Sequence, residues 1–387
     1  MARLTVTLLA AAAAAAAAAA CTVDEDCSLA GVCSAGGVCV CDAGWRGADC
    51  GALDLAPATL GSGYNLTAQG VSSWGGKTVR DPNNSSLYHL FAAEFTGGCG
   101  LDYWAPMSRI IRAEGASPAG PFAFSAEVAP TFAHNPTVTW SPADQMWLMF
   151  HIGCPYQAPT SCSAPTFSCD PGNNNNGESG ITLRTSPDLR NWTSRGIVLG
   201  ATGSSAWDVD TTNPSAVVME DGSVLLAYRG CAFNCLSDEL LSLAAAQSWR
   251  GPYTRLTGAP IIPNPAEDPH VWRDARGNWH LLMHSLEPGG GFGDGPKVGR
   301  HAFSRGLVGA PWIFNNATLA YNTKVPFTDG STVDFFRRER PQLFFSDDGA
   351  MTPLFLTTGV QQKGSGQSFT LIQPLATAAA WERARAP

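Results

Sequence analysis

Acidic, amide and basic side chains recur along this chain directly before apolar runs. Several of them precede a proline, as in Asn135-Pro136, Asp268-Pro269 and Arg340-Pro341. Carboxylates can act as acid and base, whereas amides and guanidinium groups bind hydroxyls. With their neighbours, the recurring candidates are His134, Asn135, Asn213, Glu267, Asp268, Arg338, Glu339 and Arg340. These side-chain types predict a sugar site, provided that the fold gathers them in one place.

For catalysis, we expect Glu267 or Asp268 to work with Glu339, and Asp208 to be a third carboxylate. One of these carboxyl groups should have its pKa raised by burial, so that it can act as the acid. Glu94 is a further candidate carboxylate of the site. Trp74, Trp104 and Trp207 are candidate platforms for a sugar ring.

Structural roles are the alternative for each of these residues. Asp268 could cap a strand, and Glu339 could form an ion pair with its arginine neighbours. The tryptophans could pack in the core. His89, His280 and His284 lie within strand patterns and are expected to be packed.

A repeated hairpin is what could gather these residues. Each copy has a polar residue, a proline, an apolar strand, a polar turn and a second apolar strand. The copies span 131–150, 210–229, 266–284 and 337–356, with a degenerate copy at 74–91 in which Gly75-Gly76 replaces the residue-proline pair. Five copies indicate a repeat architecture. If they are the inner strands of a propeller, the candidate residues stand at the strand starts and point into one central channel.

A second periodic signal sets the size of the repeat. Gly120-Pro121, Gly251-Pro252 and Ala310-Pro311 each follow a Ser-rich strand, and Asn191-Trp192 resembles a fourth member. The resulting unit of about 65 residues is the size of a four-stranded propeller blade. We therefore predict an all-β chain with a five-bladed β-propeller over residues 64–387.

Composition narrows the class of protein. Charged residues make up 14% of the 387 residues, against roughly 25% in an average soluble protein. The 41 Gly and 27 Pro favour tight turns over long helices. The net charge is -8 and no Lys/Arg run occurs, so nucleic acid is not an expected partner.

The first 20 residues have the pattern of a secretory signal peptide. Arg3 is followed by an apolar, alanine-rich run up to Ala20, and Cys21 comes next. A membrane anchor and a lipidated Cys21 are the alternatives. We expect cleavage, secretion and no membrane insertion afterwards. Five glycosylation sequons fit an extracellular glycoprotein: Asn65, Asn83, Asn84, Asn191 and Asn316.

Six of the twelve cysteines lie within residues 21–50. So short a segment needs cross-links for stability, and spacing alone leaves 15 pairings open for six cysteines. The order, ending in C-x-C-x5-G-x2-C, resembles an EGF-like module. That resemblance implies the pairs Cys21–Cys33, Cys27–Cys39 and Cys41–Cys50. A structural spacer or an adhesion module in contact with a protein is expected rather than a calcium site, because no acidic residue precedes Cys21 within the module. Residues 51–63 are expected to be a linker.

The other six cysteines lie between Cys99 and Cys235. Three of them fall in an insertion from Cys154 to Gly180 that interrupts the repeat, and we expect disulfides to pin this loop. The alternative is a zinc site that uses Cys231-x3-Cys235.

The hairpins with residue-proline strand starts and the segment YHLFAAEF resemble the five-bladed propeller glycoside hydrolases of the arabinanase and β-xylosidase type, family 43 and its relatives. The resemblance covers about residues 64–381. It implies hydrolysis of a glycosidic bond by a base Asp in the first blade, a modulating Asp in the second and an acid Glu in the third. This chain has Gly75 or Gly76, Asn135 and Asn213 at those positions, so that triad does not carry over.

The sequence therefore leads to two hypotheses. The first is a secreted glycoside hydrolase that uses other carboxylates of the channel on a poly- or oligosaccharide. The second is a carbohydrate-binding or adhesion protein whose catalytic carboxylates have been lost. No cofactor or metal is expected, although a calcium ion bound in the channel remains an alternative.

Overall fold

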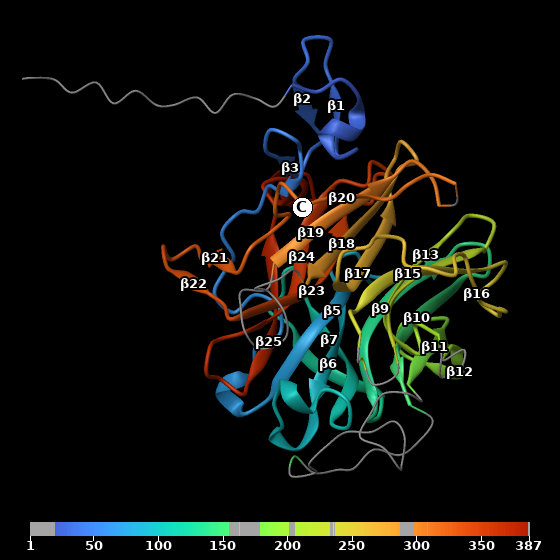
Figure 1. The fold of residues 1–387 in the computed structure, drawn as a ribbon. Helices are drawn as coiled ribbons and strands as arrows, with labels where there is room; N and C mark the ends of the chain where they lie inside the picture. The colour runs from blue at the N-terminus through green and yellow to red at the C-terminus, as the bar shows by residue number, and fades with distance from the viewer. Residues whose placement is uncertain are drawn as a thin grey trace, which may run out of the picture.

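Antiparallel sheets follow one another along the chain and form a five-bladed β-propeller, which confirms the predicted fold class. This computed structural model describes residues 20–154, 162, 179–200, 206–232, 235, 237–286, 298–307 and 309–385 (Figure 1). The predicted signal peptide, apart from Ala20, and most of the insertion after Cys154 lie outside the described residues.

Each blade is built from strands that are consecutive in the sequence. The first blade has β5 (Ser72–Arg80), β6 (Tyr88–Phe95), β7 (Ser108–Gly115) and β8 (Ala123–Ala129). The second has β9 (Ala133–Ser141), β10 (Met146–Gly153), β11 (Gly180–Ser186) and β12 (Thr193–Leu199). The third has β13 (Asp210–Val218), β14 (Val224–Cys231), β15 (Leu240–Ala246) and β16 (Thr254–Arg255). The fourth has β17 (Ala266–Arg273), β18 (Trp279–Ser285), β19 (Val298–Ser304) and β20 (Ile313–Asn315). The fifth has β23 (Arg337–Phe345), β24 (Pro353–Gln361) and β25 (Ser368–Pro374).

Burial within a blade follows its sequence. The second strands, such as β6 (YHLFAAEF) and β14, are buried along their whole length, because sheets pack against both of their faces. The outer strands β8 and β12 are largely exposed. Apolar clusters between neighbouring blades form the core, as where Leu148 and Phe150 of β10 pack with Leu226 of β14.

The ring closes where the N-terminal segment meets the last blade. Tyr64 donates its backbone N–H to the carbonyl of Thr370 in β25. The hydroxyl of Ser73 in β5 accepts a hydrogen bond from the N–H of Thr370, 3.0 Å away. Residues 51–63 also lie on the propeller, since Ala56 donates to the carbonyl of Pro374.

The remaining elements are short. They are η1 (Asp24–Cys27), β1 (Gly31–Cys33), β2 (Cys39–Cys41), β3 (Trp45–Arg46), β4 (Ala52–Leu53), η2 (Thr67–Gln69), η3 (Thr96–Gly98), η4 (Leu101–Tyr103), β21 (Lys324–Pro326), β22 (Thr332–Asp334) and α1 (Ala378–Arg383). No helix among the described residues has the length and apolar character needed to cross a bilayer.

The EGF-like module occupies one end of the molecule, beside β19 and β20 (Figure 1). Its disulfides join Cys21 to Cys33, Cys27 to Cys39 and Cys41 to Cys50, the pairs that the resemblance implies. Because Cys21 is bonded to Cys33, it is not free for lipidation in this structure. The module is disulfide-rich, as small extracellular modules typically are.

We expected from the sequence that the residue-proline pairs begin the inner strands. They instead lie inside these strands, at β-bulges. The register between first and second strands shifts at this point in each blade. Proline fits there because the bulge already interrupts the hydrogen-bond ladder. The first residue of each pair has a left-handed backbone: Gly75, Asn135, Asn213, Asp268 and Arg340 have φ between 51° and 57°.

We expect Gly75→Ala to lower the free energy of unfolding by about 1–3 kcal/mol, the usual effect of overpacking. A Cβ atom at Gly75 would lie 2.4 Å from Cγ of Arg340. Gly61→Ala is the matched control, because Gly61 also has positive φ but nothing within 4 Å of its Cβ position. Urea unfolding measures both variants, and equal losses would show that the clash is not the cause.

Candidate active site

Four side chains from the fourth and fifth blades form a buried channel cluster: Glu267, Asp268, His284 and Glu339. One carboxylate oxygen or imidazole nitrogen of each lies within 4.8 Å of the others. Glu267 and Asp268 come from the bulge of β17, His284 is the register partner of Glu267 on β18, and Glu339 comes from the bulge of β23. The fold thus brings together the three carboxylates that the repeat placed in one channel.

Glu267 is held as an anion by its strand partner. Nδ1 of His284 lies 2.9 Å from Oε1 of Glu267. Burial by itself raises the pKa of the Glu267 carboxyl, but the bond from His284, together with the nearby charges of His284 and Arg229, lowers it below its usual range.

We expected His284 only to pack within its strand, but it also belongs to the channel cluster. Burial alone lowers its pKa, but the charge of Glu339 and the bond to Glu267 raise it above the ordinary value. Its Nε2 atom is buried without a hydrogen-bond partner in the described structure.

Asp268 is in the opposite state from Glu267. Burial, followed by the neighbouring charge of Glu267, raises the pKa of its carboxyl to about 7. Its Oδ2 accepts the backbone N–H of Arg340 at 3.1 Å, and the guanidinium of Arg340 lies 3.6 Å from Oδ1. Two adjacent carboxyl groups therefore differ in protonation near neutral pH, an arrangement that suits acid and base roles.

Glu239, which the sequence analysis missed, adds a second carboxyl group with a raised pKa beside Glu267. Burial raises its pKa well above the ordinary value, although Arg229 lies 3.2 Å away and opposes this effect. Glu239 stands outside the repeated hairpin, just before β15. The only signal in the sequence is the acidic pair Asp238-Glu239, to which the repeat assigns no position.

Arg340 crosses the channel next to the cluster. Its Nη2 donates to the backbone carbonyls of Asn135 and Pro214, both at 2.8 Å. Nδ2 of Asn135 lies 3.1 Å from Oδ1 of Asn213 and 3.4 Å from Oδ1 of Asp268. The stem of Arg340 passes the bare backbone of Gly75. The bulge residues of the five blades thus form one connected polar layer.

His134 lies beside this layer as a neutral base. Its Nδ1 is 2.8 Å from Oγ of Ser108, and its ring lies 5.2 Å from that of Trp104. Burial, and then the charge of Arg340, lower its pKa to about 3.

Asp208 and Glu94 are bound elsewhere in the structure. Asp208 pairs with Arg255 and accepts from the hydroxyl of Tyr228 at 2.8 Å. Glu94 pairs with Arg109 and accepts from the hydroxyl of Tyr64 at 2.6 Å. These contacts favour the structural alternative for both residues, and neither belongs to the channel cluster.

Three other predicted sugar-binding residues also have structural contacts. Arg338 is fully buried, and its guanidinium donates to Oε1 of Gln373 at 2.7 Å. Trp74 is buried against Gly359. Trp207 is half-buried, with Gly230 packed closely against its ring.

The donor set of the channel cluster has the composition of a cation site as well as of an acid–base pair. Carboxylate oxygens suit a hard divalent cation, and the unpartnered Nε2 of His284 adds a further donor. The zinc alternative at the other candidate position is wrong, because Cys231 and Cys235 form a disulfide. In the insertion, Cys162 is bonded to Cys99.

Comparisons with known proteins fit the two parts of the chain. Residues 23–52 match the model of the Teneurin-like EGF domain. No curated protein sequence matches the chain.

Several solved glycoside hydrolases share the propeller fold at low sequence identity. The catalytic domain of the family 62 α-L-arabinofuranosidase of Coprinopsis cinerea has a TM-score of 0.56 at 12% identity, over 83% of this chain and 96% of that one. Zg3597, a family 117 glycoside hydrolase of Zobellia galactanivorans, has a TM-score of 0.54 at 12% identity, over 86% and 91%. A thermostable family 43 glycoside hydrolase has a TM-score of 0.50 at 10% identity, over 79% and 89%. These similarities establish the fold.

Proposed function

We propose that this protein is a secreted glycoside hydrolase that cleaves an O-glycosidic bond at the channel cluster. The observation that carries the proposal is the pair of adjacent carboxyl groups with opposite protonation, Glu267 ionised and Asp268 protonated up to pH about 7. The fold shared with glycoside hydrolases supports it. The EGF-like module and the disulfides support an extracellular location.

In this proposal Asp268 protonates the leaving oxygen of the glycosidic bond. Glu267 or Glu339 supplies the second carboxylate. It acts either as a nucleophile on the sugar carbon or as a base on a water molecule. The amide of Asn213 and the imidazole of His134 lie beside the cluster, where they would bind sugar hydroxyls.

The pH dependence follows from Asp268. Its folded-state pKa is raised to about 7, so its acid form is present below that pH and is lost above it. We expect kcat/KM to fall roughly tenfold per pH unit above about pH 7. In Asp268→Asn the remaining activity should be lower and should lack this alkaline limb. A limb that persists unchanged in Asp268→Asn would assign the proton donor to another group.

A carbohydrate-binding protein is the second candidate, and a specific observation favours it. Gly75, Asn135 and Asn213 carry no carboxylate at the bulges of the first three blades, and Arg340 occupies the space beside Gly75.

One experiment separates the two candidates. Reducing-sugar release is measured on a panel of plant and algal polysaccharides, with arabinose-containing ones included because of the similarity to an arabinofuranosidase. Release by the wild-type protein that Glu339→Gln abolishes supports hydrolysis with Glu339 in the machinery. Release that Glu339→Gln leaves unchanged supports a hydrolase without that role for Glu339. Binding to the panel without release would favour the second candidate.

A further inference from the structure

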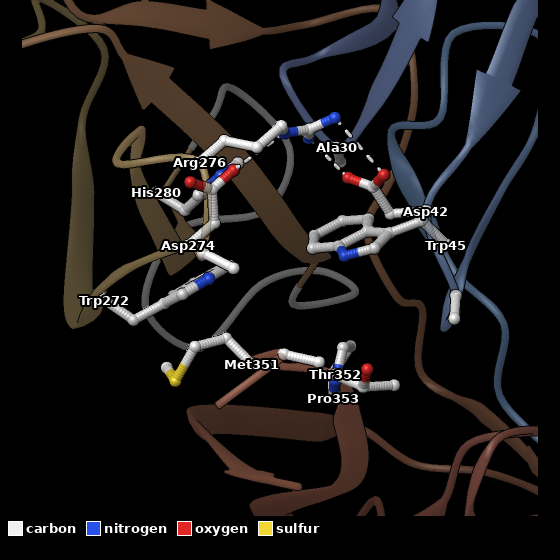
Figure 2. Close-up of a pocket in the computed structure, with 13 residues that line it drawn as sticks. Ala30, Asp42, Trp45, Trp272, Asp274, Arg276, His280, Met351, Thr352 and Pro353 are labelled. Carbon is white, nitrogen blue, oxygen red and sulfur yellow. Dashed lines mark hydrogen bonds and ion pairs between the residues drawn. The ribbon is translucent and has the colours of Figure 1, made fainter. Parts of the chain in front are cut away.

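A cavity of about 240 Å³ lies where the EGF-like module meets the propeller (Figure 2). The module contributes Asp42 and Trp45 to its lining, the fourth blade contributes Trp272, Asp274 and Arg276, and the turn before β24 contributes Met351. Neither part of the chain forms this cavity alone.

The two sides of the cavity are fixed to each other. The guanidinium of Arg276 binds both carboxylate oxygens of Asp42, with Nη1 3.3 Å from Oδ1. The ring of Trp45 packs 4.6 Å from that of His301 in β19. A Cβ atom at Gly44 would lie 2.7 Å from Pro353, which shows how closely the module approaches the fifth blade. The cavity is therefore a built feature of the docked module.

Its lining combines aromatic surface with groups that bind hydroxyls. The indole rings of Trp45 and Trp272 both line it, stacked on each other with centroids 6.3 Å apart and planes 20° apart, and both side chains are largely buried. Neither indole N–H has a hydrogen-bond partner among the described residues, and neither is among the fully buried polar groups. The polar groups of the lining are Asp42, Asp274 and Arg276, and the guanidinium of Arg276 bonds to both carboxylates.

This chemistry fits a sugar residue. A sugar ring presents an apolar face to an indole, while its hydroxyls both donate and accept hydrogen bonds, as this lining requires. The volume is slightly below the about 300–1,000 Å³ of pockets for drug-sized ligands. It suits one monosaccharide unit at a chain end or side branch.

A second cavity adjoins the first. It has a volume of about 770 Å³, and its lining includes Lys77, Met219 and Phe345 as well as Trp272 and Met351, which both cavities share. Its residues lie toward the C-terminal ends of the inner strands, beyond the bulges that carry the cluster. A polymer seated in the first cavity could therefore continue along this face, away from the cluster.

We propose that the EGF-like module and the fourth blade together form a carbohydrate-binding site that is separate from the channel cluster. The site anchors a polysaccharide on the opposite face of the propeller. Only the choice of polysaccharide rests on the proposed function; the site itself does not require hydrolysis.

The test compares wild type, Trp45→Ala and Trp45→Phe, with Trp140→Ala as a control tryptophan that lines neither cavity. Binding to each soluble polysaccharide of the panel is measured by affinity electrophoresis and calorimetry. We expect Trp45→Ala to weaken binding at least tenfold and Trp140→Ala to leave it unchanged. Trp45→Phe keeps an aromatic ring against His301 but removes the N–H donor, so an intermediate loss is expected even if Trp45→Ala folds poorly.

The outcomes separate this proposal from the proposed function. Binding that depends on Trp45 supports the site whether or not the wild type releases sugar. Hydrolysis of short oligosaccharides should be the same in wild type and Trp45→Phe. Polysaccharide binding that is equal in all four proteins would overturn the proposal. Binding of tetramethylammonium through Trp45, with no sugar bound, would also overturn it and identify a cation cage.

Discussion

Replacing Glu267 with Gln is expected to lower the rate of sugar release by about 10²–10⁴-fold, the usual contribution of a general acid or base. Glutamine keeps the shape of the side chain and can accept the bond from His284, but it carries no negative charge. The neighbouring charge that helps to raise the pKa of Asp268 also disappears. The variant therefore loses the charge difference between the two carboxyl groups without losing their packing.

Initial rates on the best polysaccharide of the panel measure this loss, and the unfolding midpoint in urea checks that the fold is kept. Glu127→Gln is the matched control, because Glu127 lies on the exposed outer strand β8 and pairs only at the surface with Arg109. A folded Glu267→Gln with wild-type rates would remove Glu267 from the machinery.

The fold was largely readable from the sequence because a propeller repeats one local pattern. Four of the five inner strands carry a proline at the bulge, with Gly75-Gly76 in the first blade, and each second strand is an apolar run, as in YHLFAAEF. Both signals arise from local backbone and burial requirements, so they recur from blade to blade. The left-handed backbone conformation at Asn135 and Arg340 could not be predicted in the same way, since these residue types are compatible with many conformations.

The sequence predicted the site residues only where they belong to the repeated hairpin. Glu267, Asp268 and Glu339 share bulge positions and therefore share the channel. Glu239 reaches the same place from outside the repeated hairpin, and nothing local marks that position. Asp208 is the converse case: its sequence position suggested the channel rim, whereas the structure pairs it with Arg255, which lies 47 residues away in sequence.

The docking of the EGF-like module onto the propeller could not be predicted from the sequence either. The module resembles a spacer when its cysteines are considered alone, because disulfides account for its stability. Its contacts with the propeller come from side chains more than 200 residues away, such as Arg276 on Asp42. Only the folded chain brings these residues together.

Above about pH 7, where Asp268 is ionised, replacing Arg340 with Met is expected to lower the free energy of unfolding by about 3–5 kcal/mol, the usual effect of removing one partner of a buried ion pair. The backbone carbonyls of Asn135 and Pro214 lose their donor, and Asp268 loses its nearest positive charge. Because Arg340 lowers the pKa of Asp268, its removal should also move the alkaline limb of the pH profile to higher pH.

Arg338→Met is the matched control, since Arg338 is equally buried but donates to Asn322 and Gln373 instead of Asp268. Both variants should unfold at lower urea concentrations than wild type, but only Arg340→Met should shift the pH profile. If Arg340→Met does not fold, Arg340→Lys retains the charge with fewer hydrogen bonds and should give a smaller shift. Adding Asp268→Asn to Arg340→Met should recover part of the stability, because it removes the carboxyl group left without its partner. A double variant no more stable than Arg340→Met would mean that the lost carbonyl contacts, rather than the stranded carboxyl group, account for the effect.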